Sequence, residues 1–208
     1  MKKLALLLSF LICVFVMQAG ATVVIGTPGS NLNMPVMNYF GGGPITVGNY
    51  TWSSTNTCCQ GGSVFGYNGG YGFGDNGEWG GLTMAGLNDS YSNWGVTDTM
   101  TFAFTNPVSW TGGFFNYYPG SSDPTTLAVW DSSHNLIESY NLTFLLTPGA
   151  FNQGKWIQFQ ETTPIAYLTM TGNYVSVSAG AVPEPGTILL LGSGVLGLAG
   201  VIRRKINL

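Results

Sequence analysis

Hydrophobic and polar residues alternate along much of the second half of the chain. Met100, Phe102 and Phe104 are separated by threonine and alanine, and residues 156–160 repeat this pattern. A repeat of two places successive side chains on opposite faces of a strand, so these stretches predict half-buried β-strands. The body, residues 22–182, has no stretch with the spacing of an amphipathic helix. The pattern therefore predicts an all-β fold, an antiparallel, jelly-roll-like β-sandwich.

Proline, glycine and asparagine divide this region into separate strands. Asn106-Pro107 is expected to end the strand that contains Phe102, and Pro148-Gly149 to end another. Gly172-Asn173 has the composition of a tight turn and predicts a hairpin. The strands expected around these breaks are Val108–Tyr118, Leu136–Leu146, Ile165–Thr171 and Tyr174–Ser178.

Apolar runs lie at both ends of the chain, outside this body. Near the start, Lys2-Lys3 precede an apolar core, and Ala19 and Ala21 form a small-residue cleavage box. This order predicts a secretory signal peptide over residues 1–21, with a helical apolar core. Near the end, residues 187–202 predict a transmembrane helix followed by a basic cluster. As a helix these 16 residues would rise about 24 Å, less than the hydrocarbon core of a bilayer, so a temporary tether is expected.

Residues 61–81 have the lowest sequence complexity, with glycines interleaved with aromatic side chains. Their composition predicts a long surface loop. An alternative is that the aromatic side chains form a platform for the face of a sugar ring. The spacing Gly72-x-Gly74-x-x-Gly77 formally matches a dinucleotide fingerprint, but no strand and helix are expected around it.

Charge is scarce and unevenly distributed. Residues 22–182 hold eight acidic residues and a single basic one, Lys155, for a formal charge of about −7. Nucleic-acid binding needs lysine and arginine against phosphates, so that class of partner is excluded.

Few residues suit catalysis. His134 is the only histidine, and no arginine precedes the tail. This inventory excludes most nucleophilic and phosphoryl-transfer mechanisms and predicts a protein that is not an enzyme, without a cofactor. Two acidic side chains across a cleft would still suffice for a glycoside hydrolase. Candidates on or near the expected strands include Asp98, Asp131, Glu138 and Glu161.

Calcium is the metal that the acidic side chains could hold. Asp75, Glu78 and Asp89 offer hard oxygen ligands in segments rich in glycine and asparagine. Zinc is not expected, because a single histidine leaves too few ligands.

Cys58 and Cys59 are the only cysteines beyond the signal peptide. In an oxidising compartment they could form a vicinal disulfide, pair with another molecule or stay free. A bond between adjacent residues closes no large loop and would stabilise the fold little.

The end of the chain resembles the PEP-CTERM sorting signal of Gram-negative bacteria. The resemblance rests on Pro183-Glu184-Pro185, the apolar run 187–202 and the basic cluster Arg203-Arg204-Lys205, within a segment covering residues 183–208. It implies export across the inner membrane, a membrane-anchored precursor and processing near Pro-Glu-Pro by an exosortase-type enzyme. It also implies a link to exopolysaccharide and biofilm. The same segment is similar to the ice-binding protein C-terminal domain.

The body resembles the β-sandwich ectodomains often attached to such tails. The resemblance rests on Leu127–Asp131, before the turn Ser132–Asn135, and on Thr163–Tyr167. The function expected is therefore that of an exported, non-enzymatic protein of the cell surface or extracellular matrix. A carbohydrate-binding module, with extracellular polysaccharide as its partner, is the alternative. A glycoside hydrolase and an ice-binding protein are further alternatives.

Overall fold

A computed structural model describes residues 22–59, 61–79, 82–88, 97–119, 125–142, 154–172 and 175–178. The signal helix expected over residues 1–21 and the tail from 183 to 208, with its helix at 187–202, lie outside these ranges. Within them, no helix has the length and apolar character needed to cross a membrane.

Most residues in the described ranges lie in antiparallel strands and almost none in helices, which confirms the prediction of an all-β fold. One short 3₁₀ helix, η1 (Gly74–Asn76), interrupts them. The strands are β1 Thr22–Ile25, β2 Tyr39–Phe40, β3 Ile45–Val47, β4 Tyr50–Ser54, β5 Ser63–Tyr67, β6 Tyr71–Gly72, β7 Glu78–Trp79, β8 Met84–Leu87, β9 Thr99–Tyr117, β10 Thr126–Trp130, β11 Leu136–Asn141, β12 Lys155–Thr171 and β13 Val175–Ser178.

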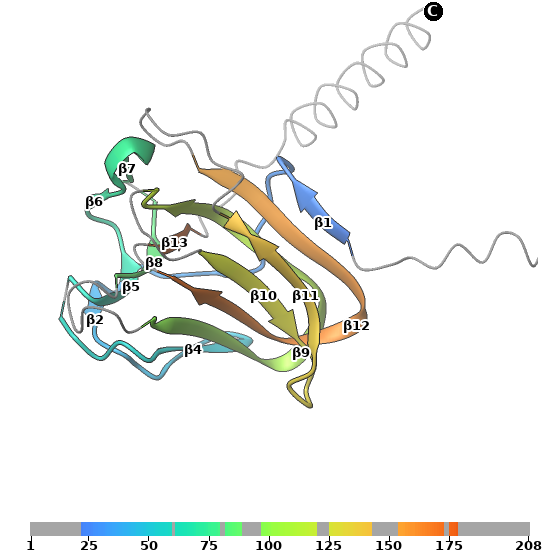
Figure 1. The fold of residues 1–208 in the computed structure, drawn as a ribbon. Helices are drawn as coiled ribbons and strands as arrows, with labels where there is room; N and C mark the ends of the chain where they lie inside the picture. Colours follow the sequence, from blue (N-terminus) through green and yellow to red (C-terminus); the bar gives the residue numbers. More distant parts are fainter. Residues whose placement is uncertain are drawn as a thin grey trace, which may run out of the picture.

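Two long strands, β9 and β12, run through both layers of a sandwich-like fold (Figure 1). The first half of β9 pairs with β4 and with the second half of β12, which continues to β10 and β11. The second half of β9 pairs with the first half of β12 and with β13, and the sheet continues through β8 and β5 to β2. We call the first group layer one and the second group layer two. The layers are thus joined by strands that pass from one to the other.

The continuity of these two strands contradicts the expectation that Asn106-Pro107 ends a strand. Instead, β9 extends through Pro107, and β12 likewise extends through Pro164. The ladder between them shifts register between Gln160 and Tyr167, where both strands turn from one layer to the other. A proline lacks the N–H that a ladder needs, but an irregularity of this kind does not require that bond.

The hairpin expected at Gly172-Asn173 is also wrong. Strand β13 pairs with β8 and β9, and β9 lies between it and β12. The backbone at Gly172 has φ 137°, and its N–H donates to the Asp98 carbonyl at 3.3 Å, which directs the chain away from β12. Strand β11 covers only the first part of the expected strand 136–146, whose end lies outside the described ranges.

The main core lies between the two layers, as the alternating pattern predicts. Met100 and Phe102 from layer one are fully buried, and Phe104 is 8 % exposed. They share one cluster with Phe115 and Phe159 from layer two. Burial of this apolar area is the main favourable contribution to folding.

The glycine-rich segment 61–81 is not the surface loop expected from its composition. It contributes β5 to layer two and the short β6–β7 hairpin, which lies near β5 and β8 (Figure 1). Tyr71 and Phe73 of this segment form a second buried cluster with Val64 and Met84. The missing side chain of Gly86 permits this contact, because a Cβ there would lie 3.1 Å from both Tyr71 Cζ and Val64 Cγ2.

Replacing Phe102 by alanine should remove a fully buried ring from the main core. We expect the free energy of unfolding to fall by about 3–5 kcal/mol, measured by equilibrium denaturation in urea. Phe40→Ala is the matched control, because Phe40 is 41 % exposed and should change stability much less. Equal losses in the two variants would contradict this assignment of the core.

Candidate functional site

The outer face of layer one is rich in hydroxyl groups. The strand register aligns Ser53, Thr101, Thr169, Ala128 and Ser139 in a row across five strands. These side chains alternate with the buried core positions, so they lie on the side of the sheet away from the core. Unlike the outer face of layer two, this face carries side chains that are mostly half-buried or exposed.

Two large aromatic side chains interrupt this hydroxyl-rich face. Trp130 on β10 and Tyr167 on β12 are directly opposite each other in the ladder. The Trp130 indole Nε1–H donates to Thr169 Oγ1 at 2.9 Å, and the Thr169 hydroxyl donates to the Ala128 carbonyl at 3.3 Å. This chain of bonds holds the indole in one orientation on a rigid sheet.

The turn between β10 and β11 adds a third ring. Asp131 Oδ1 accepts hydrogen bonds from the N–H groups of Ser133 and Asn135, each at 2.8 Å. Asn135 Nδ2 donates to Asp131 Oδ2 at 2.9 Å. The two bonds from Asn135, first its side chain and then its backbone, are the main causes that lower the pKa of Asp131. The carboxylate therefore fixes the turn.

Fixing the turn places His134 over Tyr167. The backbone of His134 is left-handed, with φ 60°, and its ring is stacked on the Tyr167 ring, with centroids 4.3 Å apart and an interplanar angle of 27°. The sequence indicates only a turn residue at this position. The stacking depends on the pairing of β10 with β12, which brings Tyr167 under the turn.

Together these side chains form a hollow that is open to solvent. It has a volume of about 310 Å³ and is lined by Thr101, Trp130, His134, Tyr167 and Thr169. This volume is at the lower end for ligand sites, and the lining combines aromatic surface with a few hydroxyl groups, as such sites do. The sequence pattern does not mark Trp130 and Tyr167 as site residues. Their positions on the outer side of alternating strands were the available signal.

The aromatic platform expected in segment 61–81 is absent from the described part of that segment. Phe65 and Phe73 are fully buried, Tyr71 is 7 % exposed, and Tyr67 is half-buried. These rings instead pack into the two hydrophobic clusters, because burying a large aromatic side chain removes much apolar area from water.

The calcium ligands expected from the sequence are only partly described. Asp75 lies in η1 and Glu78 in β7, both exposed, whereas Asp89 lies outside the described residues. In the part of the chain that the structure describes, no three acidic, cysteine or histidine side chains gather as a metal site would need.

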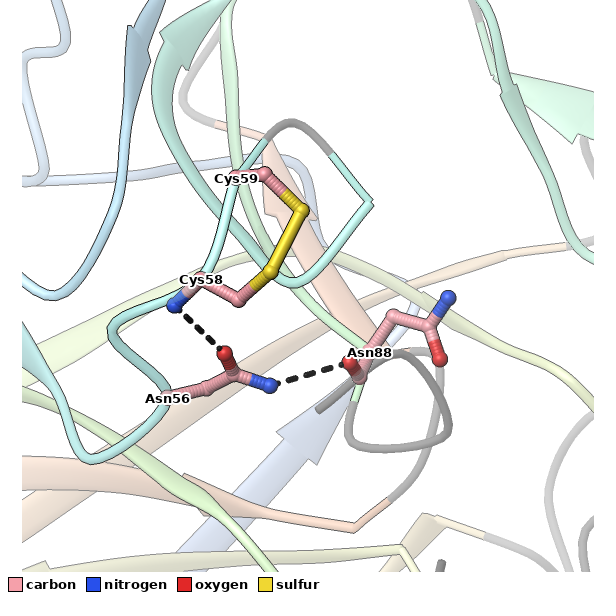
Figure 2. Close-up of a disulfide and its surroundings, with 4 residues drawn as sticks. All are labelled: Asn56, Cys58, Cys59 and Asn88. Carbon is pink, nitrogen blue, oxygen red and sulfur yellow. Dashed lines mark hydrogen bonds between the residues drawn. A yellow bond between two sulfur atoms is a disulfide. The ribbon is translucent and has the colours of Figure 1, made fainter. Parts of the chain in front are cut away.

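Cys58 and Cys59 form a disulfide between adjacent residues in the connection from β4 to β5 (Figure 2). The buried Asn56 supports this segment: its Oδ1 accepts from the Cys58 N–H at 2.9 Å, and its Nδ2 donates to the Asn88 carbonyl at 3.1 Å (Figure 2). The Gly62 N–H also donates to the Cys59 carbonyl at 2.9 Å. Hydrogen bonds of Asn56, rather than the crosslink, connect this turn to the sheet.

Glu161 is a buried acidic side chain whose ionisation is affected by the charge of Glu138. Glu161 is 7 % exposed, and its Oε1 has no hydrogen-bond partner. Burial raises the pKa of Glu161, and the nearby charge of Glu138 raises it further. Neither carboxylate lines the hollow on layer one.

Comparison with known protein families adds one finding. Residues 181–205 match the PEP-CTERM protein-sorting motif. The chain carries a PEP-CTERM sorting tail. This tail indicates an exported protein whose membrane-anchored precursor is processed by an exosortase-type enzyme and then reaches a surface or extracellular location. No curated protein and no solved structure matches the chain.

Replacing both Cys58 and Cys59 by serine should change stability by no more than about 1 kcal/mol, because the bond closes a minimal loop. Asn56→Ala should destabilise the protein more, because it removes both hydrogen bonds of the Asn56 side chain, one from the Cys58 N–H and one to the Asn88 carbonyl. Urea denaturation of both variants measures this. A larger loss in the double-serine variant would contradict the assignment.

Glu161 should make the protein less stable as the pH rises. Its pKa in the folded state is raised above the ordinary value of 4.5, so the folded state binds more protons than the unfolded state from pH 4.5 up to the raised pKa. The free energy of unfolding therefore falls across that window. Glu161→Gln should flatten this dependence, and Glu138→Gln should flatten it partly. Denaturation curves at a series of pH values measure the slopes, and equal slopes in wild type and Glu161→Gln would refute the idea.

Proposed function

We propose that this protein is a non-enzymatic component of the cell surface or extracellular matrix of a Gram-negative bacterium, linked to exopolysaccharide and biofilm. A signal peptide directs it through the inner membrane. The C-terminal helix holds the precursor there until an exosortase-type enzyme processes it. The β body is then the part that acts outside the cell.

The observation that carries this proposal is the position of the sorting motif. The last described strand, β13, ends at Ser178, and the motif begins at residue 181. The tail therefore follows the folded body almost directly, with the Pro183-Glu184-Pro185 triplet between the body and the apolar run. A processing enzyme at the outer surface of the membrane would meet this triplet next to the bilayer. Arg203, Arg204 and Lys205 would keep the end of the chain on the opposite, cytoplasmic side.

The non-enzymatic role is supported by the residues that the body offers. His134, the only histidine, is committed to stacking on Tyr167, and the hollow beside it is lined by no carboxylate. The buried Glu161 is unlike the two solvent-reachable acids that flank a glycosidic bond in a hydrolase. These features suit a protein that binds or builds a matrix better than one that turns over a substrate.

Changing the triplet Pro183-Glu184-Pro185 to three alanines should block processing. In cells that contain an exosortase, we expect the wild-type chain in a shortened form at the surface or in the medium, and the variant as a full-length membrane-bound precursor. Immunoblots of membrane, surface and medium fractions, with an antibody against the body, measure both forms. Replacing Arg203, Arg204 and Lys205 by serine should instead release an unprocessed chain. Identical processing of wild type and the triple-alanine variant would refute the sorting proposal.

A further inference from the structure

We propose that the hollow formed by Trp130, His134 and Tyr167 is a binding site for one pyranose ring of a neutral polysaccharide. The proposal takes its biological setting from the proposed surface location. The binding itself does not depend on the sorting route, so each idea can fail separately.

The aromatic rings provide the apolar part of such a site. One face of a pyranose ring carries mainly C–H groups, which pack against the flat faces of tryptophan and tyrosine. Trp130 is held by its bond to Thr169, and Tyr167 is held by stacking with His134. Both rings are therefore ordered before a ligand arrives, and this reduces the entropy lost on binding.

The threonines provide the polar part. Thr101 and Thr169 are direct cross-strand partners and line the hollow between the rings. The Thr101 hydroxyl can both donate and accept hydrogen bonds, as the hydroxyls around a pyranose ring require. The Thr169 hydroxyl already donates to the Ala128 carbonyl and accepts from Trp130, so it has one lone pair left to accept a bond from a sugar hydroxyl. The row of hydroxyl side chains continues directly to Ser53 on β4, and on the other side it reaches Ser139 on β11 beyond Ala128. Neighbouring sugars of a polymer could thus lie along the same row.

The charges around the hollow favour a neutral polymer over an acidic one. The lining holds no lysine or arginine, and the Asp131 carboxylate lies at the base of the turn that carries His134. Lys155, the only basic residue of the body, pairs with Phe115 in layer two, at the other end of β12. A polyanion would meet a body with a formal charge of about −7 and no cationic partner at this site.

The surroundings also distinguish a sugar from an apolar protein segment. An interface between proteins usually has an apolar centre that extends over many side chains. Here the large apolar side chains are the three rings and Leu136, which lies opposite Trp130 in the ladder and is 52 % exposed. On the other side Tyr167 lies opposite Ala103, and Thr169 lies opposite Thr101. This apolar area of three rings and one leucine is small for a protein interface and adjoins hydroxyl side chains, so it suits a sugar ring better than a second copy of the chain.

Affinity electrophoresis of the full chain in mild detergent tests the proposal. Separate gels contain dextran, β-glucan, mannan and galactan as neutral probes, and alginate as an acidic one. We expect retardation in at least one neutral gel and none beyond the polymer-free control in alginate. No retardation in any neutral gel, or stronger retardation in alginate, would overturn the proposal.

Variants locate the binding in the hollow. Trp130→Ala and Tyr167→Ala should each weaken binding to the retarding polymer at least tenfold, while Phe40→Ala, which removes an exposed aromatic ring elsewhere, should leave it unchanged. If either alanine variant fails to fold, two milder changes decide. Thr101→Val keeps the shape and removes one hydroxyl, and His134→Asn keeps a residue that tolerates positive φ but removes the stacked ring.

Both milder variants should weaken binding severalfold while thermal unfolding stays close to wild type. Unchanged affinity in these variants would overturn the site. Sedimentation analysis separates the remaining occupant: if the wild type self-associates and Trp130→Ala or Thr101→Val abolishes this, the hollow is an interface between copies and the proposal is wrong.

Discussion

The pairing of β9 with β12 is the constraint on which the rest of the structure depends. These strands, of 19 and 17 residues, are the only described elements that belong to both layers, and every other strand of the large sheet is added to them directly or through a neighbour. Their backbones approach closely, since a Cβ at Gly112 would overlap the Ile157 carbonyl oxygen and lie 2.8 Å from Gln158 Cα. The bend of both strands near Pro107 and Pro164 then folds one continuous sheet over the main core.

Because of this arrangement, the outer face of layer two is covered by other described residues and the outer face of layer one is not. On layer two, side chains that alternate with the core meet the β6–β7 hairpin and become a second cluster, so the aromatic rings of the glycine-rich segment are used for stability. On layer one, the corresponding side chains are mainly threonine, serine and alanine, and they remain half-buried or exposed. The hollow with Trp130 and Tyr167 lies on this second face because β10 and β12 bring their outward positions into register.

The sorting tail concerns the location of the protein, and the hollow concerns what the protein could bind there. The tail indicates the location of the protein, because its triplet, apolar run and basic cluster form a sorting motif for a membrane-anchored precursor that an exosortase-type enzyme processes. A surface location would expose the layer-one face to extracellular polymers. A neutral, aromatic and hydroxyl-lined hollow is then suited to sugars, whereas the acidic body would repel anionic material.

The sequence by itself determined the export and sorting expectation, the all-β class and the core positions of Met100, Phe102 and Phe104. These depend on linear order and on a repeat of two, which local sequence carries completely. It could not determine that β9 and β12 continue through proline, that β13 pairs with β9 rather than with β12, or that the aromatic rings of segment 61–81 are largely buried. Each of these features depends on which strands pair with each other in the folded sheet. The site was hidden for the same reason. Tyr167 is distant in sequence from Trp130 and His134, and only the pairing of β10 with β12, together with the Asp131 turn, brings the three rings together.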